Sequence, residues 1–258
     1  MSTIFKKLFS KKTKPEAETV EEQAEEIKSR KLAPRAPRIY VRPLGTVFFS
    51  QVAPLAVKRV EAFNISTSGI GLVKGSYSLA PEVDSLLHGL LIIGSKRHAV
   101  TVKVVHISDT TVGTQYQKPS TEMVQDIDLY FRVEFAAIET IKVDPKYHKQ
   151  ELDGISHWIH GDHVDLYYVS NADKIVRLRL TFFDNYVEII AGKSHVFGKI
   201  SEGNNSSEKV SAKVAQLVNP QPVLETDQID TLFKLLKYIP HLPEVHRNQI
   251  VQMISAAK

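Results

Sequence analysis

Two short groups of residues have the types and spacing needed to bind a small anion. The first is Arg38-Ile-Tyr-Val-Arg42, on a proline-interrupted segment that also carries bases at Lys28, Arg30, Lys31 and Arg35. Paired arginines present planar guanidinium groups, which bind phosphates through two parallel hydrogen bonds. The same groups fit the O6 and N7 edge of guanine and can stack on bases.

The second group is Asn64-Ile-Ser66-Thr-Ser-Gly69, which directly follows the apolar run VKRVEAF. Asn64 supplies a side-chain amide and Ser66 a hydroxyl, while Gly69 allows backbone and ligand to approach closely. Together, the two groups describe a site for a small anionic nucleotide that contains guanine.

An RxxxR motif followed by (D/N)xSxxG in an all-β segment resembles the PilZ family, the bacterial receptors for cyclic di-GMP. Val104-Val-His106 and Val112-Gly113-Thr-Gln-Tyr116 resemble later strands of that family, so the resemblance covers roughly residues 34–138. It implies a six-stranded antiparallel PilZ-type barrel and a receptor that does no chemistry on its ligand.

Carried over to this sequence, the resemblance implies that Arg38 and Arg42 bind the phosphates and guanine edges of the ligand. It also implies that Asn64 and Ser66 form hydrogen bonds to a guanine and that Gly69 lets the ligand approach the backbone closely. Arg35 is a further candidate for ligand binding.

Two departures from the family pattern leave alternatives open. Lys31 and Arg35 offer a second register, in which an ammonium replaces the first arginine and cannot bind guanine bidentately. We prefer Arg38 and Arg42 because that register has two arginines. Pro37 precedes Arg38, where many family members carry a base or an apolar residue, so the ligand stoichiometry stays open.

Other readings of the same residues are structural. Residues 28–42 can be a solvated linker and residues 64–69 a turn that ends a strand, which would leave a PilZ-like adaptor without nucleotide. His157, His160 and His163 are nominally capable of binding metal, but we interpret them as part of a polar loop. Asp126 and Asp128 lack a partner base in the sequence, so we expect no catalytic role for them. We therefore expect a protein that is not an enzyme, and we expect no metal and no cofactor.

The chain has 258 residues, of which 43% are hydrophobic and 24% charged, and it contains no cysteine. These values exclude collagen-like and wholly disordered proteins, disulfides and thiolate sites. The net charge of +4 is unevenly distributed: residues 1–14 carry +5, residues 15–27 carry −6 and residues 28–42 carry +6, which leaves −1 on the remainder. The globular part is therefore not basic, which argues against a nucleic-acid polymer as partner.

We divide the chain into an N-terminal extension (1–33), a PilZ-like barrel (34–138) and a C-terminal α+β module (139–258). The extension joins a basic amphipathic stretch to an acidic helix, and residues 1–12 can contact a membrane surface or remain a solvated tail. No run of eighteen apolar residues exists, so no helix is expected to span a bilayer.

Short apolar runs predict the strands of the barrel, and YFRVEFAAI (130–138) is counted among them. TEMVQDIDLYF is left open as helix or strand. In the module we expect a β-meander of three or four strands, with hairpin turns at Asn171 and Asp184, then a linker over 201–224. Two helices follow, beginning near Thr226 and Glu244, and cover one face of the meander.

The strand pattern thus predicts a mainly β protein, and the resemblance to PilZ domains implies a non-enzymatic cyclic di-GMP receptor. We expect it in the cytoplasm or peripherally at the inner membrane. Its conformational change would signal to a motility, pilus or exopolysaccharide system through the N- and C-terminal regions. The alternative function is a protein-interaction adaptor that does not bind nucleotide.

Overall fold

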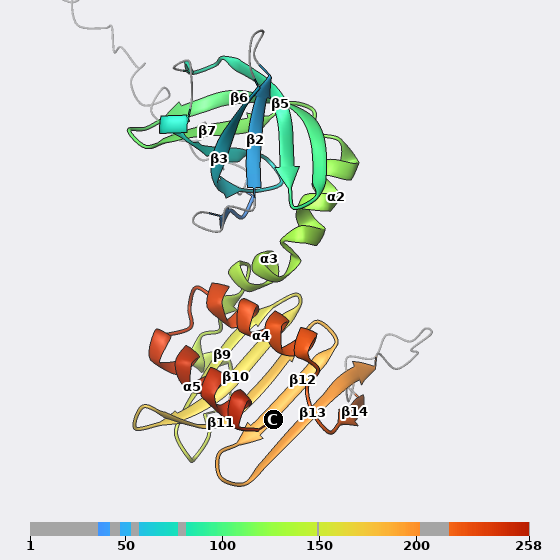
Figure 1. Ribbon diagram of the computed structural model, residues 1–258. Helices are drawn as coiled ribbons and strands as arrows, with labels where there is room; N and C mark the ends of the chain where they lie inside the picture. The colour runs from blue at the N-terminus through green and yellow to red at the C-terminus, as the bar shows by residue number, and fades with distance from the viewer. Residues whose placement is uncertain are drawn as a thin grey trace, which may run out of the picture. The chain divides into compact units, whose positions relative to one another are not determined.

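A computed structural model describes residues 36–41, 47–52, 57–76, 81–148, 150–201 and 217–257. The expected extension (1–33), the alternative register at Lys31 and the candidate residues Arg35 and Arg42 lie outside the described residues. Two antiparallel β-sheets account for most of the described chain, together with four α-helices (Figure 1). The expectation of a mainly β protein is confirmed.

The first sheet closes on itself. Its strands are β1 (Ile39–Tyr40), β2 (Val47–Val52), β3 (Val57–Ile65), β4 (Ile70–Val73), β5 (Leu86–Ile93), β6 (Lys96–Ile107) and β7 (Thr111–Tyr116), with a single 3₁₀ turn, η1 (Lys74–Ser76), after β4. Their order is β1-β3-β2-β5-β6-β7-β4, and β3 also pairs with β4. Six strands therefore form a closed antiparallel ring, to which β1 is added at β3.

Alternate side chains of each strand point inward and fill the interior of the closed sheet. On β7, Val112, Thr114 and Tyr116 are buried, whereas Gln115 between them is exposed. β-Branched and aromatic residues fit such half-buried strands, which explains why these segments extend. Burial raises the pKa of Tyr116, whose hydroxyl lies inside this core.

Helix α2 (Thr121–Tyr130) follows β7 and closes over the core of the first sheet with Met123 and Ile127. Ser120 caps this helix, because its side chain accepts a hydrogen bond from the backbone N–H of Met123. The segment that the sequence left open is thus a helix.

The prediction of a strand over 130–138 is wrong. Residues Arg132–Ile138 form helix α3, in which Phe135, Ala136 and Ala137 are buried. Phe131 and Phe135 are four residues apart, the spacing of one helical face, and alanine is the strongest helix former. The short apolar run fitted both periods, and the adjacent alanines favoured the helix.

The second sheet is a meander of seven strands in chain order, not three or four. The strands are β8 (Ile141–Lys142), β9 (Ile155–Gly161), β10 (Val164–Asn171), β11 (Lys174–Phe182), β12 (Asn185–Ile190), β13 (Ser194–Ser201) and β14 (Leu217–Gln221), with the 3₁₀ turn η2 (Pro145–Tyr147) after β8. The expected histidine-bearing loop is strand β9, and the expected linker ends in β14. The predicted turns are present. Ala172 and Asp173 have positive φ between β10 and β11, and Phe183 has positive φ just before Asp184 between β11 and β12.

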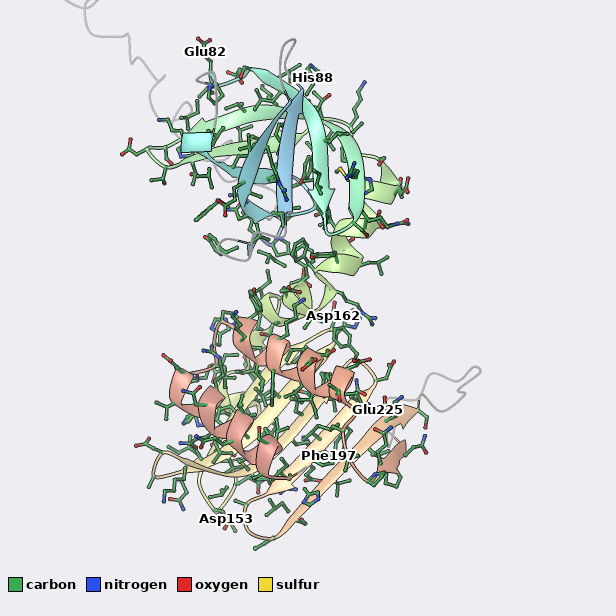
Figure 2. The ribbon with its side chains drawn as sticks, viewed as in Figure 1. Glu82, His88, Asp153, Asp162, Phe197 and Glu225 are labelled. Atoms are coloured by element: carbon green, nitrogen blue, oxygen red, sulfur yellow. The ribbon has the colours of Figure 1, made fainter. Side chains whose placement is uncertain are left out.

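Two C-terminal helices cover one face of the second sheet, as expected (Figure 1). They are α4 (Thr226–Tyr238) and α5 (Glu244–Ala256). Glu225 and Gln228 form a capping box at the start of α4, which places the N-cap one residue before Thr226. Phe197 of β13, labelled in Figure 2, belongs to the core between helices and sheet.

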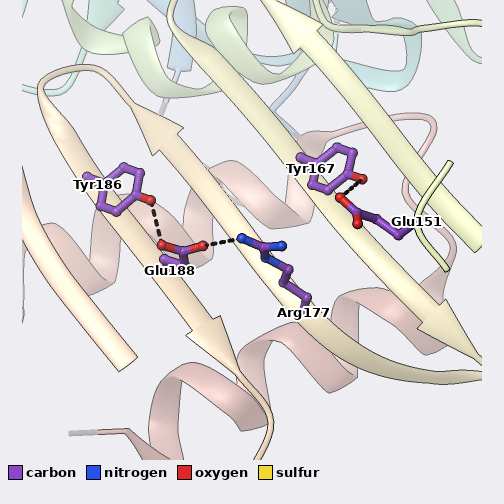
Figure 3. A network of polar contacts seen from close by, with 5 residues as sticks. All are labelled: Glu151, Tyr167, Arg177, Tyr186 and Glu188. Atoms are coloured by element: carbon purple, nitrogen blue, oxygen red, sulfur yellow. Dashed lines mark hydrogen bonds and ion pairs between the residues drawn. The ribbon is translucent and has the colours of Figure 1, made fainter. Parts of the chain in front are cut away.

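The opposite face of the second sheet carries a polar network (Figure 3). The Arg177 guanidinium donates to Glu188 at 3.0 Å, and the Tyr186 hydroxyl donates to the same carboxylate at 2.9 Å. Burial and this hydrogen bond raise the pKa of Tyr186 to about 12. The Tyr167 hydroxyl lies 3.2 Å from Glu151. An antiparallel sheet can face solvent on one side, and here its polar side chains are held by one another.

None of the helices in the described ranges is both long and apolar enough to cross a bilayer.

His157 makes the fold sensitive to pH. Its ring stacks on Tyr168 with centroids 4.6 Å apart, and its Nε2 lies 2.9 Å from the Ser170 hydroxyl. Burial lowers the pKa of His157, and the nearby His246 lowers it further. The unfolded chain therefore takes up this proton more readily than the folded chain, so stability is lost as pH falls below the unfolded value of about 6.5.

We expect the free energy of unfolding, measured by urea denaturation, to decrease between about pH 7.5 and pH 5.5. His157→Gln keeps a hydrogen-bonding side chain but does not titrate, so its decrease should be smaller. The exposed His241 provides a matched control, and His241→Gln should behave as wild type. Equal pH dependence in His157→Gln and wild type would contradict this assignment.

Candidate functional site

Strand β1 pairs with the end of β3 and so brings the two sequence motifs together. Ile39 is opposite Ile65, and Tyr40 is opposite Asn64. The backbone N–H of Val41 continues the pairing by donating to the carbonyl of Phe63 at 3.0 Å. The arginine-bearing segment therefore runs antiparallel to the strand that leads into the Asn64–Gly69 turn.

Alternation on β1 determines which of its side chains face outward. Ile39 and Val41 are each 1% exposed and belong to the core, whereas Tyr40 is 61% exposed and Arg38 is also exposed. Because successive side chains point to opposite faces, Arg38 and Tyr40 share the outer face. In the part of the chain that the structure describes, the Arg38 guanidinium and the Asn64 amide have no hydrogen-bond or ion-pair partner, so both are free to bind a ligand.

Ser66 is engaged by its own turn. Its hydroxyl accepts hydrogen bonds from the backbone N–H groups of Ser68 at 3.3 Å and Gly69 at 3.2 Å. Its backbone N–H donates to the Gly69 carbonyl at 2.9 Å, and the residue is 1% exposed. In this structure the Ser66 hydroxyl therefore shapes the turn that follows Asn64.

Packing within the chain requires a glycine at position 69. A Cβ at this position would overlap the backbone carbonyl oxygen of Thr114 on β7. The neighbouring Tyr116 N–H donates to the Ser68 carbonyl at 3.0 Å, which fixes the turn against β7. The close approach that Gly69 permits in this structure is to the chain's own backbone.

A row of outward positions crosses the closed sheet beside this turn. Asn64 on β3 is opposite Gly71 on β4, Gly71 is opposite Gly113 on β7, and Gly113 is opposite His106 on β6. With Tyr40 these positions form what we call the cross-strand row: Tyr40, Asn64, Gly71, Gly113 and His106. The two glycines, which we call the glycine floor, contribute no side chain between Asn64 and His106; Gly71 is buried and Gly113 is half-buried.

The Asn64 amide lies over this floor, because a Cβ on Gly71 would stand 2.6 Å from its Oδ1. Strands are spaced by about 4.8 Å, so three steps from Asn64 to His106 span roughly 14 Å. An amide that both donates and accepts hydrogen bonds and an exposed guanidinium have the chemistry to bind a planar polar ring and an anion. Sequence reasoning did not identify Tyr40, Gly71 or His106 as site residues, since only the strand register aligns them.

The alternative chemical sites are accounted for by structural contacts. Asp126 on α2 has a partner base after all: it lies 3.1 Å from His98 Nε2 and 3.7 Å from Lys96 Nζ, both on β6. These contacts tie α2 to the closed sheet. Burial raises the pKa of the neighbouring Asp128. Across the described ranges, no group of three or more histidine, cysteine or acidic side chains is arranged to hold a metal.

Comparisons with known proteins add little to this geometry. No protein-family model matches the chain, and no curated protein matches it. Among solved structures, an uncharacterised protein of Legionella is similar, at 16% sequence identity and a TM-score of 0.28. The match covers 37% of this chain and 90% of the Legionella chain.

Two glycines near the turn, Gly69 and Gly113, should respond differently to a methyl group. Gly69→Ala must displace the Thr114 backbone, so we expect it to lower the free energy of unfolding by about 1–3 kcal/mol. Gly113→Ala is the matched control, because its Cβ would lie 3.5 Å from the Cβ of His106, an ordinary contact. Its stability should change by less than about 0.5 kcal/mol. Urea denaturation measures both, and equal effects would contradict the packing described for Gly69.

Proposed function

We propose that this chain is a non-enzymatic receptor for cyclic di-GMP, bound on the outer face of the closed sheet. The observation that carries the proposal is the pairing of β1 with β3, which brings the segment that carries Arg38 alongside the strand end at Asn64 and the Ser66–Gly69 turn. These are the residues on which the resemblance to PilZ domains rests. Their being brought together from positions more than twenty residues apart supports a shared role.

Each residue has a part in the proposed site that matches its chemistry. Arg38 would bind a phosphodiester or a guanine edge through its planar guanidinium. Asn64 would bind a guanine, since its amide can both donate and accept hydrogen bonds. Ser66 and Gly69 would act indirectly, by holding the turn that positions Asn64. Arg42 and Arg35 join the site on sequence grounds.

The ligand would act by stabilising one arrangement of the chain. Strand β1 has only two residues, and charge-assisted hydrogen bonds to a nucleotide would hold its arginine segment on β3. In the proposed scheme, this ordering changes how the N-terminal extension and the second sheet meet a protein of a flagellar, pilus or exopolysaccharide system. Residues 1–12 could add a peripheral membrane contact.

A protein-interaction adaptor is the second candidate function. It is favoured by the face of the second sheet that the helices leave uncovered, where Trp158, Tyr167 and Arg179 lie in register. Tryptophan, tyrosine and arginine are the residue types enriched in the energetically dominant parts of interfaces. This function would not depend on a nucleotide.

Isothermal titration calorimetry with cyclic di-GMP tests the receptor. Wild type should bind saturably. Arg38→Ala and Asn64→Ala should weaken binding by about 10-fold or more, as expected for the loss of a hydrogen bond to a charged or tightly held group. Arg42→Ala should do the same if the preferred register holds.

Arg97→Ala is the matched control, because Arg97 is an exposed arginine of β6 that lies outside the row. It should bind as wild type does. No heat of binding with folded wild-type protein, or equal affinities for Arg38→Ala and Arg97→Ala, would reject the receptor and favour the adaptor.

A further inference from the structure

His106 stands at the far end of the glycine floor from Asn64. A register shift between Val104 and His106 interrupts the pairing of β6 with β7, and His106 is paired with Gly113 beyond it. β-Bulges of this kind re-aim side chains and are frequent next to functional sites. The residue is exposed on the outer face.

The positions next to His106 in the cross-strand row carry no side chain. Gly113 and Gly71 contribute no side chain to the row, so the imidazole is the first side chain met when crossing the floor from Asn64. Arg38 lies on the other side of the floor, on the segment paired to β3. Arg38 and His106 thus lie on opposite sides of Asn64 and the two glycines.

Cyclic di-GMP has matching symmetry, because its two phosphodiesters lie on opposite sides of one ring. An arginine on one side of the floor can meet only one of them. We propose that His106 hydrogen-bonds the second phosphodiester and that its protonation strengthens binding, an inference that rests on the proposed receptor function. His106 is thereby a ligand-binding residue that neither sequence motif contains.

The charged groups around His106 are few. Strands β4 and β7 carry no aspartate, glutamate, lysine, arginine or histidine. On β6 itself Lys103 is paired with Asp84 at 2.8 Å, and Asp84 belongs to the segment whose backbone pairs with Val104. Asp109 lies in the turn between β6 and β7. Lys74 of η1 is also near this edge, because its backbone N–H donates to the Thr110 carbonyl. With Lys103 paired to Asp84, His106 is the remaining basic side chain that β4, β7 and the described end of β6 place on this edge.

Imidazole side chains gain a proton between about pH 8 and pH 5, whereas phosphodiesters keep their charge over that range. Wild type should therefore bind cyclic di-GMP about three- to fivefold more tightly at about pH 5.5 than at about pH 8, the size expected of one exposed ion pair. Calorimetry at both pH values measures the ratio.

Two variants separate contact from structure. His106→Gln removes the titrating group, so its affinity should be low and the same at both pH values. His106→Arg carries a positive charge throughout, so its affinity should be high and the same at both. His88→Gln is the control: His88 is an exposed histidine of β5 outside the row, labelled in Figure 2, and the ratio should stay as in wild type.

The proposal is overturned if wild type binds with the same affinity at both pH values, or if His106→Gln keeps the wild-type ratio. In either case the receptor function stands, because binding itself is observed. Absence of wild-type binding at both pH values rejects the receptor function and this inference together.

Discussion

The closed sheet depends on β3, because this strand pairs with three others. Its first residues pair with β2, its last residues pair with β4, and Ile65 and Asn64 also pair with β1. The contact with β4 joins the two ends of the ring and leaves no free edge within it, which protects the sheet from edge-to-edge association. Asn64 is therefore both a point of closure and the residue on which the candidate site centres, so the geometry of the site follows from the closure of the sheet.

The glycines around Asn64 show how one residue type serves two purposes. Gly69 is required by packing, since any side chain would meet the Thr114 backbone. Gly71 makes room for the Asn64 amide, and Gly113 leaves space beside His106. A glycine in a motif can thus be needed by the fold although the motif suggests a ligand. Gly71 and Gly113, by contrast, lie outside the motif, and only strand register places them beside Asn64 and His106.

Much of the fold was predictable where a segment fitted a single period. Residues 176–182 alternate strictly, and the strand, its two turns and both C-terminal helices are confirmed. The prediction of a strand over 130–138 is wrong because a short apolar run fits both a strand and a helix. The prediction of a loop for the histidine run 157–163 is wrong up to Gly161, because polar residues in this run belong to a strand with Ile159 buried on one face and His160 exposed on the other. The motifs of the candidate site were visible in the sequence, but the cross-strand row was not, because register between strands far apart in the chain is a tertiary property.

Strand β6 joins the candidate site to the rest of the chain through direct contacts. His106 stands near its end, while Lys96 and His98 near its start hold Asp126 of α2. Helix α3 follows α2 in the chain, and its buried Glu134 pairs with Lys234 of α4 at 2.9 Å. A continuous set of contacts is necessary for two sites to be coupled, but coupling also requires that one link have two arrangements. The hydrogen-bonded network on the uncovered face of the second sheet is fixed by paired charges and aromatic rings. The pairing of β1 with β3 is short, since β1 has two residues, but Ile39 and Val41 anchor that segment in the core of the closed sheet.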